Sequence, residues 1–412
     1  FLAHGAIVNI VNGTVILSAV IFKQIKGGKV FNDYPSVGWL IITLYFYAAM
    51  SVLWAPAPDI AIDNLYLYAP YIVLSVLIAP LLIKNNEDLY RSFLALIFMG
   101  GVTTILLLFF TEWGYRRILL ASNMVEGRSN PLAIANLSGY VMLSAVLLNL
   151  KQEYKVWNVL RWILVVFCLG IVVKTGSRGQ FLLMILLAML FLPVSRPIIN
   201  IKRFVPLFIS ILFIAVVSYW ALQEYTSDYT DKEAARWDTE RMRDDVGGRF
   251  DAAEELISKW YSSPQNILFG LGGSASYDKS IFGFYTHVVP LEILGELGLI
   301  GFLLFLIIIF KSYKTFRRCL NKSKGDSFKR GVFATIASIV LFEFLLSFKQ
   351  GSFLGSQLLF GLVLVFAKLE NSYAEENPSY KIINTEARNS QSDLKDPNSG
   401  ILRYKKSSKV RV

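Results

Sequence analysis

The stretch FYTHVVPLEILGELGLIGFLLFLIIIF, Phe284–Phe310, joins a histidine to a long apolar segment. Pro290 suits the first turn of a helix, where its missing N–H would have no partner anyway. The segment after it is long enough to cross a membrane, since about 20 apolar residues span a hydrocarbon core of roughly 30 Å. His287 stands just before this helix, and the only other histidine is His4. The stretch therefore predicts a titratable side chain at the mouth of a membrane helix.

Apolar runs of similar length recur along the chain of 412 residues. Hydrophobic residues make up 54% and charged residues only 17%, below the roughly 25% that soluble domains contain. We predict an all-α polytopic membrane protein with eleven spans. The chain begins with Phe rather than Met, so a missing helix would make twelve. The expected spans are residues 5–22, 38–54, 65–83, 92–111, 131–150, 156–173, 179–195, 204–222, 289–310, 331–348 and 353–370.

Lys and Arg sort the connections between these spans into two sets, and the richer set normally faces the cytoplasm. The strongest anchor is the connection 311–330, where many basic residues accompany one acidic residue, Asp326. The opposite, outer side then receives the N-terminus and the large loop 223–288, which holds more acidic than basic residues. The other outer connections are 55–64, 112–130, 174–178 and 349–352.

Residues 1–370 are expected to form a single transmembrane domain. Residues 371–412 are rich in Ser, Asn and charged residues, and are predicted to be a disordered basic cytoplasmic tail. Its basic end either binds anionic lipid or is merely solvated. The net charge of +11 is therefore explained without nucleic acid. Cys168 and Cys319 are expected at different depths, so we predict no disulfide, and two Cys with two His do not form a metal-ligand cluster.

Within the large loop, apolar residues recur at helical spacing from Phe250 to Tyr261, and Ser262-Ser263-Pro264 ends the pattern. This predicted helix either caps the membrane bundle, which we favour, or lies on the bilayer surface. The following segment, Phe269–Ser280, is glycine-rich and is predicted to be a flexible loop. It follows no strand, which argues against a nucleotide-phosphate loop.

His287 is the first candidate for chemistry. We expect Thr286 or His287 near the N-cap of the helix, where partial positive charge disfavours imidazolium and attracts phosphate. A neutral imidazole there accepts a proton from an attacking hydroxyl. The alternative is a structural histidine that caps the helix or lies at the membrane interface. Glu292 and Glu296 share one face of the helix and either support His287, pair with an arginine, or pack against polar groups of neighbouring helices.

Several arginines fall on the predicted outer side, against the charge bias. Arg178 lies in a tight turn between two apolar helices, Arg128 directly precedes a span, and Arg249 lies in the large loop. Guanidinium groups bind phosphate bidentately and keep their charge, so an outward cluster suits the pyrophosphate of a membrane lipid. Arg116 and Arg117 fit a lipid-headgroup anchor better.

Three motifs carry a resemblance to a known family. They are TGSRGQFLL (Thr175–Leu183), GGRFDAAEELISKWYSSPQNILFGLGG (Gly247–Gly273) and THVVPLEILGELGLIGFLLF (Thr286–Phe305), in that order, with the large loop between the first and last. Together they resemble the O-antigen ligase and polymerase superfamily of bacterial polysaccharide assembly. Many members have Asn after the histidine, whereas this chain has Val288.

The resemblance implies a GT-C-like membrane glycosyltransferase of the bacterial inner membrane, with its active site facing the periplasm or exterior. The implied donor is a glycan on undecaprenyl pyrophosphate, and the acceptor is lipid A-core or another glycan. It implies no nucleotide sugar, cofactor or metal. By motif, His287 corresponds to the general base and Arg178 and Arg249 to pyrophosphate binders, with Arg128 a looser match. A polymerase of lipid-linked repeat units is the alternative, and a non-enzymatic polysaccharide transporter or flippase is the second alternative.

Overall fold

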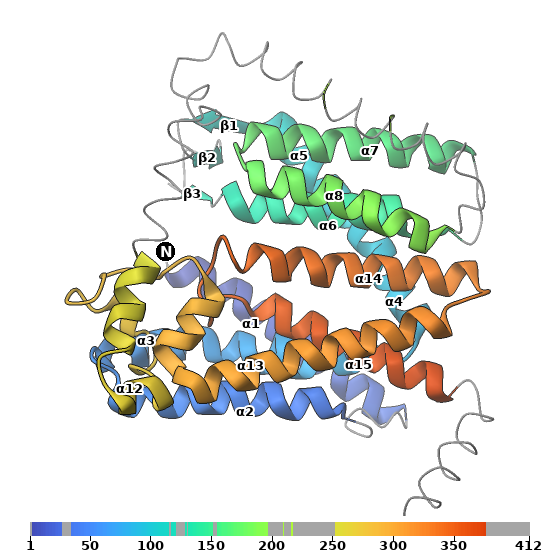
Figure 1. Cartoon of the computed structure of the whole chain (residues 1–412). Coiled ribbons are helices and arrows are strands. Elements are labelled where there is room, and N and C mark those ends of the chain that lie inside the picture. Colours follow the sequence, from blue (N-terminus) through green and yellow to red (C-terminus); the bar gives the residue numbers. More distant parts are fainter. Residues whose placement is uncertain are drawn as a thin grey trace, which may run out of the picture.

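The computed structural model describes residues 2–26, 34–114, 117–120, 128–129, 131–150, 155–196, 209, 216 and 252–375. Within these ranges, long helices run side by side as a bundle (Figure 1). The helices are α1 (Leu2–Ile25), α2 (Ser36–Ser51), η1 (Val52–Trp54), α3 (Pro58–Tyr71), η2 (Ile72–Ile78), η3 (Ala79–Leu82), α4 (Asn86–Ala95), η4 (Leu96–Gly100), α5 (Gly101–Phe110), α6 (Pro131–Leu147), α7 (Lys155–Lys174), α8 (Arg178–Ser195), a helix over 252–260, α12 (Pro264–Phe269), η6 (Ala275–Tyr277), α13 (Val289–Lys322), α14 (Ser327–Leu346) and α15 (Gln357–Glu375).

The predicted spans correspond well to these helices. Each falls on a helix of the described residues except 204–222, which lies outside them apart from two positions. By length and composition, six described helices are able to cross a membrane: Ser36–Trp54, Pro58–Leu82, Asn86–Leu107, Val156–Lys174, Arg178–Ser195 and Val289–Lys322. The helical, multi-pass character is confirmed, while the total of eleven or twelve spans and the GT-C-like arrangement remain predictions.

The last predicted span is misplaced by several residues. Its helix, α15, begins at Gln357 rather than 353 and continues to Glu375, past the predicted end at 370. The later end is explained by α13, from which Thr315 Oγ1 and Arg318 Nη1 donate to the Glu370 carboxylate at 2.7 and 2.9 Å. These bonds attach the end of α15 to α13, although the sequence there predicts the start of a polar tail. The rest of the predicted tail lies outside the described residues.

A small antiparallel sheet stands between α5 and α6, within the predicted outer connection 112–130. Its strands are β1 (Thr111–Gly114), β2 (Arg117–Leu120) and β3 (Arg128–Ser129), in the order β1-β2-β3. The sequence analysis did not predict these strands, because each is too short to show an alternating apolar pattern.

Two clusters of buried apolar side chains hold the bundle together. The first lies among α6, α7, α8 and α14 and includes Met142, Cys168 and Phe333. The second lies among α2, α13 and α15 and includes Ile41 and Phe360. In Figure 1, α14 runs between the layer of α6, α7 and α8 and the layer of α13 and α15. Since lipid is as apolar as these side chains, close packing stabilises such a bundle more than removal from water does.

Small residues permit this close packing, and the cysteines lie within it. A Cβ at Gly139 of α6 would stand 2.7 Å from Cζ of Phe342 in α14, so only glycine allows this approach. Cys168 and Cys319 are both buried and free. Both thiols therefore act as small apolar side chains here.

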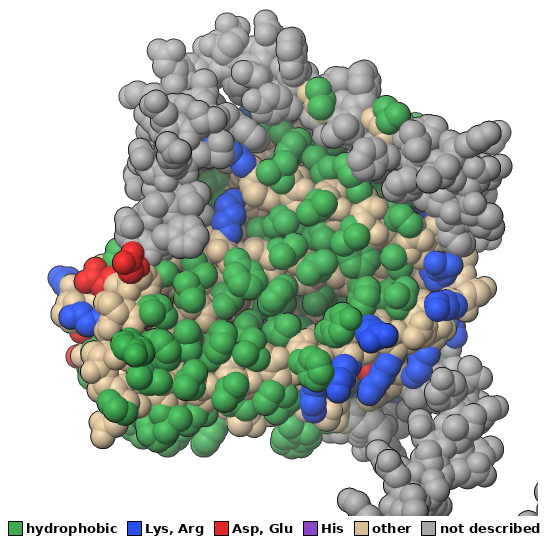
Figure 2. All heavy atoms as spheres, viewed as in Figure 1, with side chains coloured by type: hydrophobic (Ala, Val, Ile, Leu, Met, Phe, Trp, Pro, Cys, Tyr) green, Lys and Arg blue, Asp and Glu red, His purple; other side chains and the backbone are tan. Residues whose placement is uncertain are grey.

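The sequence sorts the connections between spans into a basic set and an outer set. In the structure, the two sets lie at opposite ends of the bundle. At the predicted cytoplasmic end, Lys23 Nζ donates to the carbonyl of Leu82 at 2.6 Å, and Arg330 Nε donates to that of Val194 at 2.9 Å. Cations in these positions satisfy free carbonyls at helix C-termini. Figure 2 shows Lys and Arg gathered at this end, hydrophobic side chains over the middle, and Asp and Glu near the opposite end.

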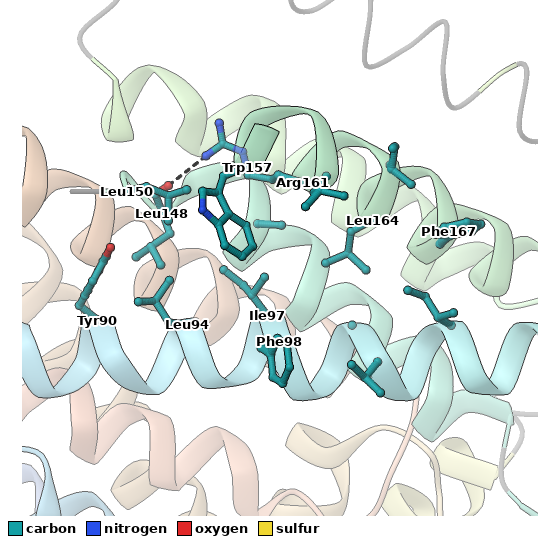
Figure 3. Close-up of a pocket in the computed structure, with 16 residues that line it drawn as sticks. Tyr90, Leu94, Ile97, Phe98, Leu148, Leu150, Trp157, Arg161, Leu164 and Phe167 are labelled. Atoms are coloured by element: carbon teal, nitrogen blue, oxygen red, sulfur yellow. Dashed lines mark hydrogen bonds between the residues drawn. The ribbon is translucent and has the colours of Figure 1, made fainter. Parts of the chain in front are cut away.

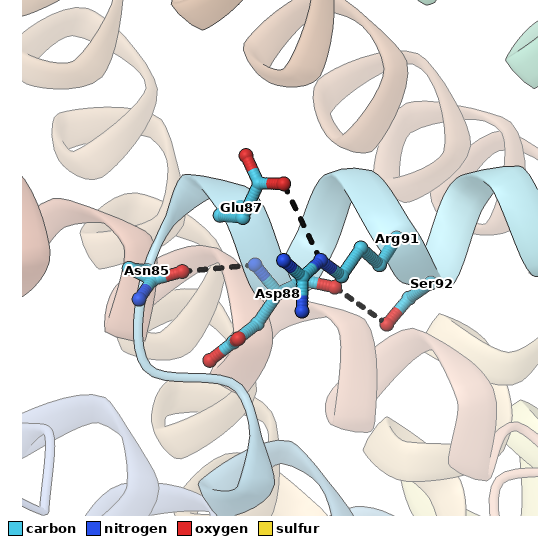
Figure 4. A network of polar contacts seen from close by, with 5 residues as sticks. All are labelled: Asn85, Glu87, Asp88, Arg91 and Ser92. Atoms are coloured by element: carbon cyan, nitrogen blue, oxygen red, sulfur yellow. Dashed lines mark hydrogen bonds and ion pairs between the residues drawn. The ribbon is translucent and has the colours of Figure 1, made fainter.

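The start of α4 shows how this end is organised locally (Figure 4). Asn85 is its N-cap, and its side chain accepts a hydrogen bond from the backbone N–H of Asp88 at 2.8 Å. Glu87 in the first turn pairs with Arg91 one turn later, at 3.3 Å. Asn is among the preferred N-cap residues because it satisfies an N–H that has no partner inside the helix. The helix therefore begins at Asn86, six residues before the predicted span 92–111.

Candidate functional site

His287 lies on strained backbone just before α13. Its φ of 63° is in the left-handed region, which residues other than glycine seldom adopt. The residues on either side, Thr286 and Val288, are buried, so the position of the histidine is fixed by its neighbours. Strained residues that are held by their surroundings concentrate at functional sites. In its backbone conformation and its buried neighbours, His287 differs from an ordinary surface histidine.

The helix after His287 begins at Val289, and Pro290 stands in its first turn, as the sequence predicts. The N-cap position is Val288, and no side chain caps it. His287 therefore lies next to the N-cap, as expected. The side chains of Thr286 and His287 do not cap the helix.

Two aromatic rings lie beside the imidazole. The ring centroids of His287 and Tyr285 are 4.2 Å apart, and those of His287 and Phe284 are 5.5 Å apart. Tyr285 in turn lies 6.3 Å from Tyr277. Burial raises the pKa of Tyr277, with further contributions from neighbouring acidic groups that begin with Glu292, so its phenol stays neutral. The imidazole is half-buried beside these aromatic rings.

Arg178 is the first residue of α8 and follows a rigid turn. Gly176 adopts a φ of 67°, and Ser177 N donates to the Val172 carbonyl at 3.3 Å. Thr175 Oγ1 donates to Ser177 Oγ at 2.9 Å, and both side chains are buried. The half-buried guanidinium therefore leaves the chain from a defined position at a helix N-terminus.

The N-termini of α8 and α13 are joined by the turn that follows α14. On one side, Lys349 Nζ donates to Oε1 of Gln180 in the first turn of α8, at 3.3 Å. On the other side, the Ser347 carbonyl accepts a hydrogen bond from Val289 N, the first residue of α13, at 2.8 Å. The predicted arginine and histidine consequently lie at the same end of the bundle, on elements that share this turn.

Glu296 holds the glycine-rich loop in place. Its carboxylate accepts hydrogen bonds from Ser274 N at 2.8 Å, Ser276 N at 3.1 Å and Ser276 Oγ at 2.8 Å. The loop backbone also donates from Leu271 N to Gly295 O and from Gly272 N to Glu296 O, both at 2.9 Å. The prediction of a flexible loop was therefore wrong, because a carboxylate buried in α13 organises its N–H groups.

Glu292 has a similar architectural part. Its Oε1 accepts a hydrogen bond from Phe353 N at 2.9 Å, in the turn before α15. This contact explains why residues 353–356 form a turn instead of starting the helix. Of the predicted supporting roles, packing against polar groups of neighbouring elements fits both carboxylates best.

Removing the Glu296 carboxylate is expected to release the loop. In Glu296→Ala, three buried donors lose their acceptor, and each unsatisfied buried group costs about 1–3 kcal/mol. We expect faster amide hydrogen exchange over residues 271–283, with the remaining helices unaffected. The matched control is Glu254→Ala, which removes an exposed carboxylate from the neighbouring helix. Equal exchange in the two variants would contradict this role for Glu296.

The helix over 252–260 caps the bundle, as we predicted. Ala252, Ala253 and Leu256 are buried. A Cβ at Gly295 of α13 would stand 2.6 Å from Cγ of Leu256, so the helix packs tightly against the first turns of α13. Ala253 and Leu256 of its apolar stripe are therefore covered by protein, while Tyr261 at the end of the stripe is exposed.

Comparison with protein families connects this site to a known group. Residues 163–306 match the O-antigen ligase family model. The match confirms the resemblance to the O-antigen ligase superfamily and supports a membrane protein of the O-antigen ligase/polymerase family. No curated protein matches the chain significantly.

The O-antigen ligase match covers most of the predicted site. Arg178, Arg249, His287, Glu292 and Glu296 fall inside it. Arg249 is outside the residues that the structure describes, so its place in the site remains a prediction.

The other predicted outer arginines, Arg116, Arg117 and Arg128, lie outside the family match. Arg128 is in β3, directly before α6, and its side chain is not among those described. The same holds for Arg117 in β2, while Arg116 lies between the described strands. Their predicted contacts with phosphate or lipid headgroups therefore remain predictions.

A polar network that was not predicted from the sequence lies beside Arg178. Gln180 Nε2 donates to Asn136 Oδ1 of α6 at 3.3 Å and to Gln350 Oε1 at 2.6 Å. Gln350 Nε2 donates to Asn136 as well, at 3.2 Å. Three amides and Lys349 thus meet between apolar helices. An available signal was the polar pair Lys349-Gln350 directly after an apolar span.

A large apolar groove lies elsewhere, between α4–α5 and α7 (Figure 3). It encloses about 810 Å³, and Phe98, Trp157 and Leu164 are among its lining residues. Its main charged group is Arg161, whose Nη1 donates to the Leu148 carbonyl at 3.4 Å. Arg161 lies near the start of α7, roughly 20 Å along that helix from the turn before α8. The groove suits hydrocarbon chains and is separate from the candidate site.

Proposed function

We propose that this chain is a membrane glycosyltransferase that moves a glycan from an undecaprenyl-diphosphate donor to an acceptor hydroxyl, as an O-antigen ligase does. The observation that carries the proposal is the shared turn after α14. It joins the N-terminus of α8, which bears Arg178, to the N-terminus of α13, before which His287 stands. One site thereby combines a fixed cation with a base.

Arg178 would bind the donor diphosphate. Guanidinium donates two parallel hydrogen bonds to phosphate oxygens, and the N-terminus of α8 adds partial positive charge. A diphosphate leaves readily when fixed positive groups stabilise the charge that develops on it. Arg249 and Arg128 are proposed to join this set on the strength of the motifs alone.

His287 would act on the acceptor. The neutral imidazole takes the proton of the acceptor hydroxyl as the oxygen attacks the anomeric carbon of the donor sugar. A new C–O bond forms in line with the bond that breaks, and the diphosphate departs with that bonding pair. The fixed position of His287 between buried neighbours supports this role, because a base must be held within hydrogen-bond reach of its proton.

The transporter alternative is less well supported by α13. Gly298 interrupts this helix, with φ 64° and ψ −166°, and interrupted helices in transporters expose backbone groups to ions near the bilayer midplane. Here the interruption is filled by the chain itself, since Gly295 O and Glu296 O accept from the glycine-rich loop. The polar groups described at this end favour a surface site.

The test is a transfer assay with purified protein in proteoliposomes. The donor carries one glycan unit on undecaprenyl diphosphate, and lipid A-core is the acceptor. We expect mass spectrometry to detect acceptor that carries the glycan. Donor that carries two glycan units would instead identify a polymerase, and the absence of both products in protein that binds donor would refute a transferase.

A further inference from the structure

We propose that Lys349 is a further binding residue for the donor diphosphate, and that Gln180 positions its ammonium group beside Arg178. This inference rests on the proposed function. Lys349 lies outside the family match at residues 163–306, and the turn that carries it is distant in sequence from the motifs of that match. The structure alone brings it to the site.

A glycine makes room for the lysine. Gly179 directly follows Arg178, and a Cβ there would stand 2.4 Å from Nζ of Lys349, 2.8 Å from its Cδ and 3.0 Å from its Cε. The end of the lysine side chain therefore lies directly on the backbone of the first turn of α8. Any larger residue at position 179 would displace the ammonium group. Arg178 thus provides a guanidinium group, and Gly179 leaves the space in which the ammonium group of Lys349 lies.

Amides then fix the ammonium group. Lys349 Nζ donates to Gln180 Oε1 at 3.3 Å, while the amide nitrogen of Gln180 is turned towards Asn136 and Gln350. Gln180 is fully buried. Because the side-chain nitrogen of Gln180 donates to these two amides, its oxygen is held towards Lys349. Gln180 is in this sense a positioning residue.

The direction of Lys349 argues against an ordinary headgroup anchor. A lysine at a helix end usually extends its stem towards the water, so that the charge reaches the lipid headgroups. Lys349 instead lies half-buried across Gly179, between α14 and α8. A diphosphate carries enough negative charge for both a guanidinium and an ammonium.

The turn that carries Lys349 also contacts the start of α13, just after His287. Ser347, two residues before Lys349, accepts the hydrogen bond from Val289 N at 2.8 Å. Lys349 consequently comes from the element that joins the two helix N-termini. A cation in this place would hold the diphosphate between the arginine and the histidine, so that the anomeric carbon next to it faces His287.

The experiment measures binding and transfer separately in protein in detergent micelles. Binding of undecaprenyl diphosphate is measured by thermophoresis, with undecaprenyl monophosphate as a second probe. We expect Lys349→Ala to raise the dissociation constant for the diphosphate by about tenfold or more, the loss of one charge-assisted hydrogen bond. The monophosphate should be affected less. Lys349→Arg should recover most of the affinity.

The control is Lys311→Ala, which removes a lysine whose Nζ donates to Ser36 Oγ at the opposite end of the bundle. It should leave binding unchanged. If Lys349→Ala does not fold, Lys349→Gln takes its place, because it keeps a donor and removes the charge. Unchanged diphosphate affinity in the folded variant would overturn the assignment of Lys349.

The two proposals fail differently. If the wild-type protein binds the diphosphate through Lys349 yet forms no glycan product, the transferase function fails and the binding assignment stands. If transfer depends on His287 while Lys349→Ala binds donor normally, only the inference about Lys349 fails. A larger effect of Gln180→Leu on diphosphate affinity than on thermal stability would further support positioning by Gln180.

Discussion

Alanine in place of His287 is expected to lower the rate of glycan transfer by about 10²- to 10⁴-fold, the usual contribution of a general base. The variant should still bind undecaprenyl diphosphate, because the cations that hold the donor remain. It should also fold, since the imidazole is half-buried and its ring contacts are with Tyr285 and Phe284. The measurement is the initial rate in the proteoliposome assay, normalised to inserted protein.

The matched control for this variant is His4→Ala, which removes the other histidine of the chain. It should transfer glycan at the wild-type rate. Transfer by His287→Ala at the same rate as this control would refute the base assignment. Loss of donor binding together with loss of transfer would instead point to a structural part for His287.

Alanine in place of Gly298 is expected to destabilise the protein by about 2–6 kcal/mol, through strain and overpacking together. The backbone at Gly298, with φ 64° and ψ −166°, is in a region that only glycine populates. An added Cβ would also stand 2.4 Å from the backbone nitrogen of Gly270 and 2.5 Å from the carbonyl oxygen of Leu268. These atoms belong to the end of α12 and to the start of the loop that Glu296 holds, and both are backbone atoms with little freedom to move.

Gly325→Ala is the control for this variant. Gly325 also has a positive φ, 90°, but a Cβ there would meet nothing within 4 Å. Its substitution should cost only the conformational strain, about 1 kcal/mol. Thermal unfolding in detergent measures both variants. Similar melting temperatures for Gly298→Ala and Gly325→Ala would show that the contact between Gly270 and Gly298 does not matter.

Much of the bundle was predictable from sequence because membrane helices follow from composition alone. Long apolar runs require helices wherever lipid surrounds them, and the predicted starts near Val289 and Arg178 agree with the structure. The interruption at Gly298 was not predicted. The sequence Glu-Leu-Gly-Leu-Ile-Gly continues an apolar run, and only the loop that packs against Gly298 shows that the helix breaks there.

The candidate site was predictable in its local parts and not in its long-range ones. His287 before a proline, and Arg178 in a tight turn, are visible as short motifs. The contact of Lys349 with Gly179 joins positions far apart in the sequence, and glycine gives no sign of the side chain that lies on it. The order of the glycine-rich loop depends on Glu296, which a single sequence does not connect to Ser274 and Ser276.

The most direct test of this account is a cryo-electron microscopy map of the protein in nanodiscs with bound undecaprenyl diphosphate. We expect diphosphate density at the N-termini of α8 and α13, in contact with Arg178 and Lys349 and next to His287. Density for the diphosphate at the opposite end of the bundle, for example beside Arg161 in the apolar groove, would contradict it.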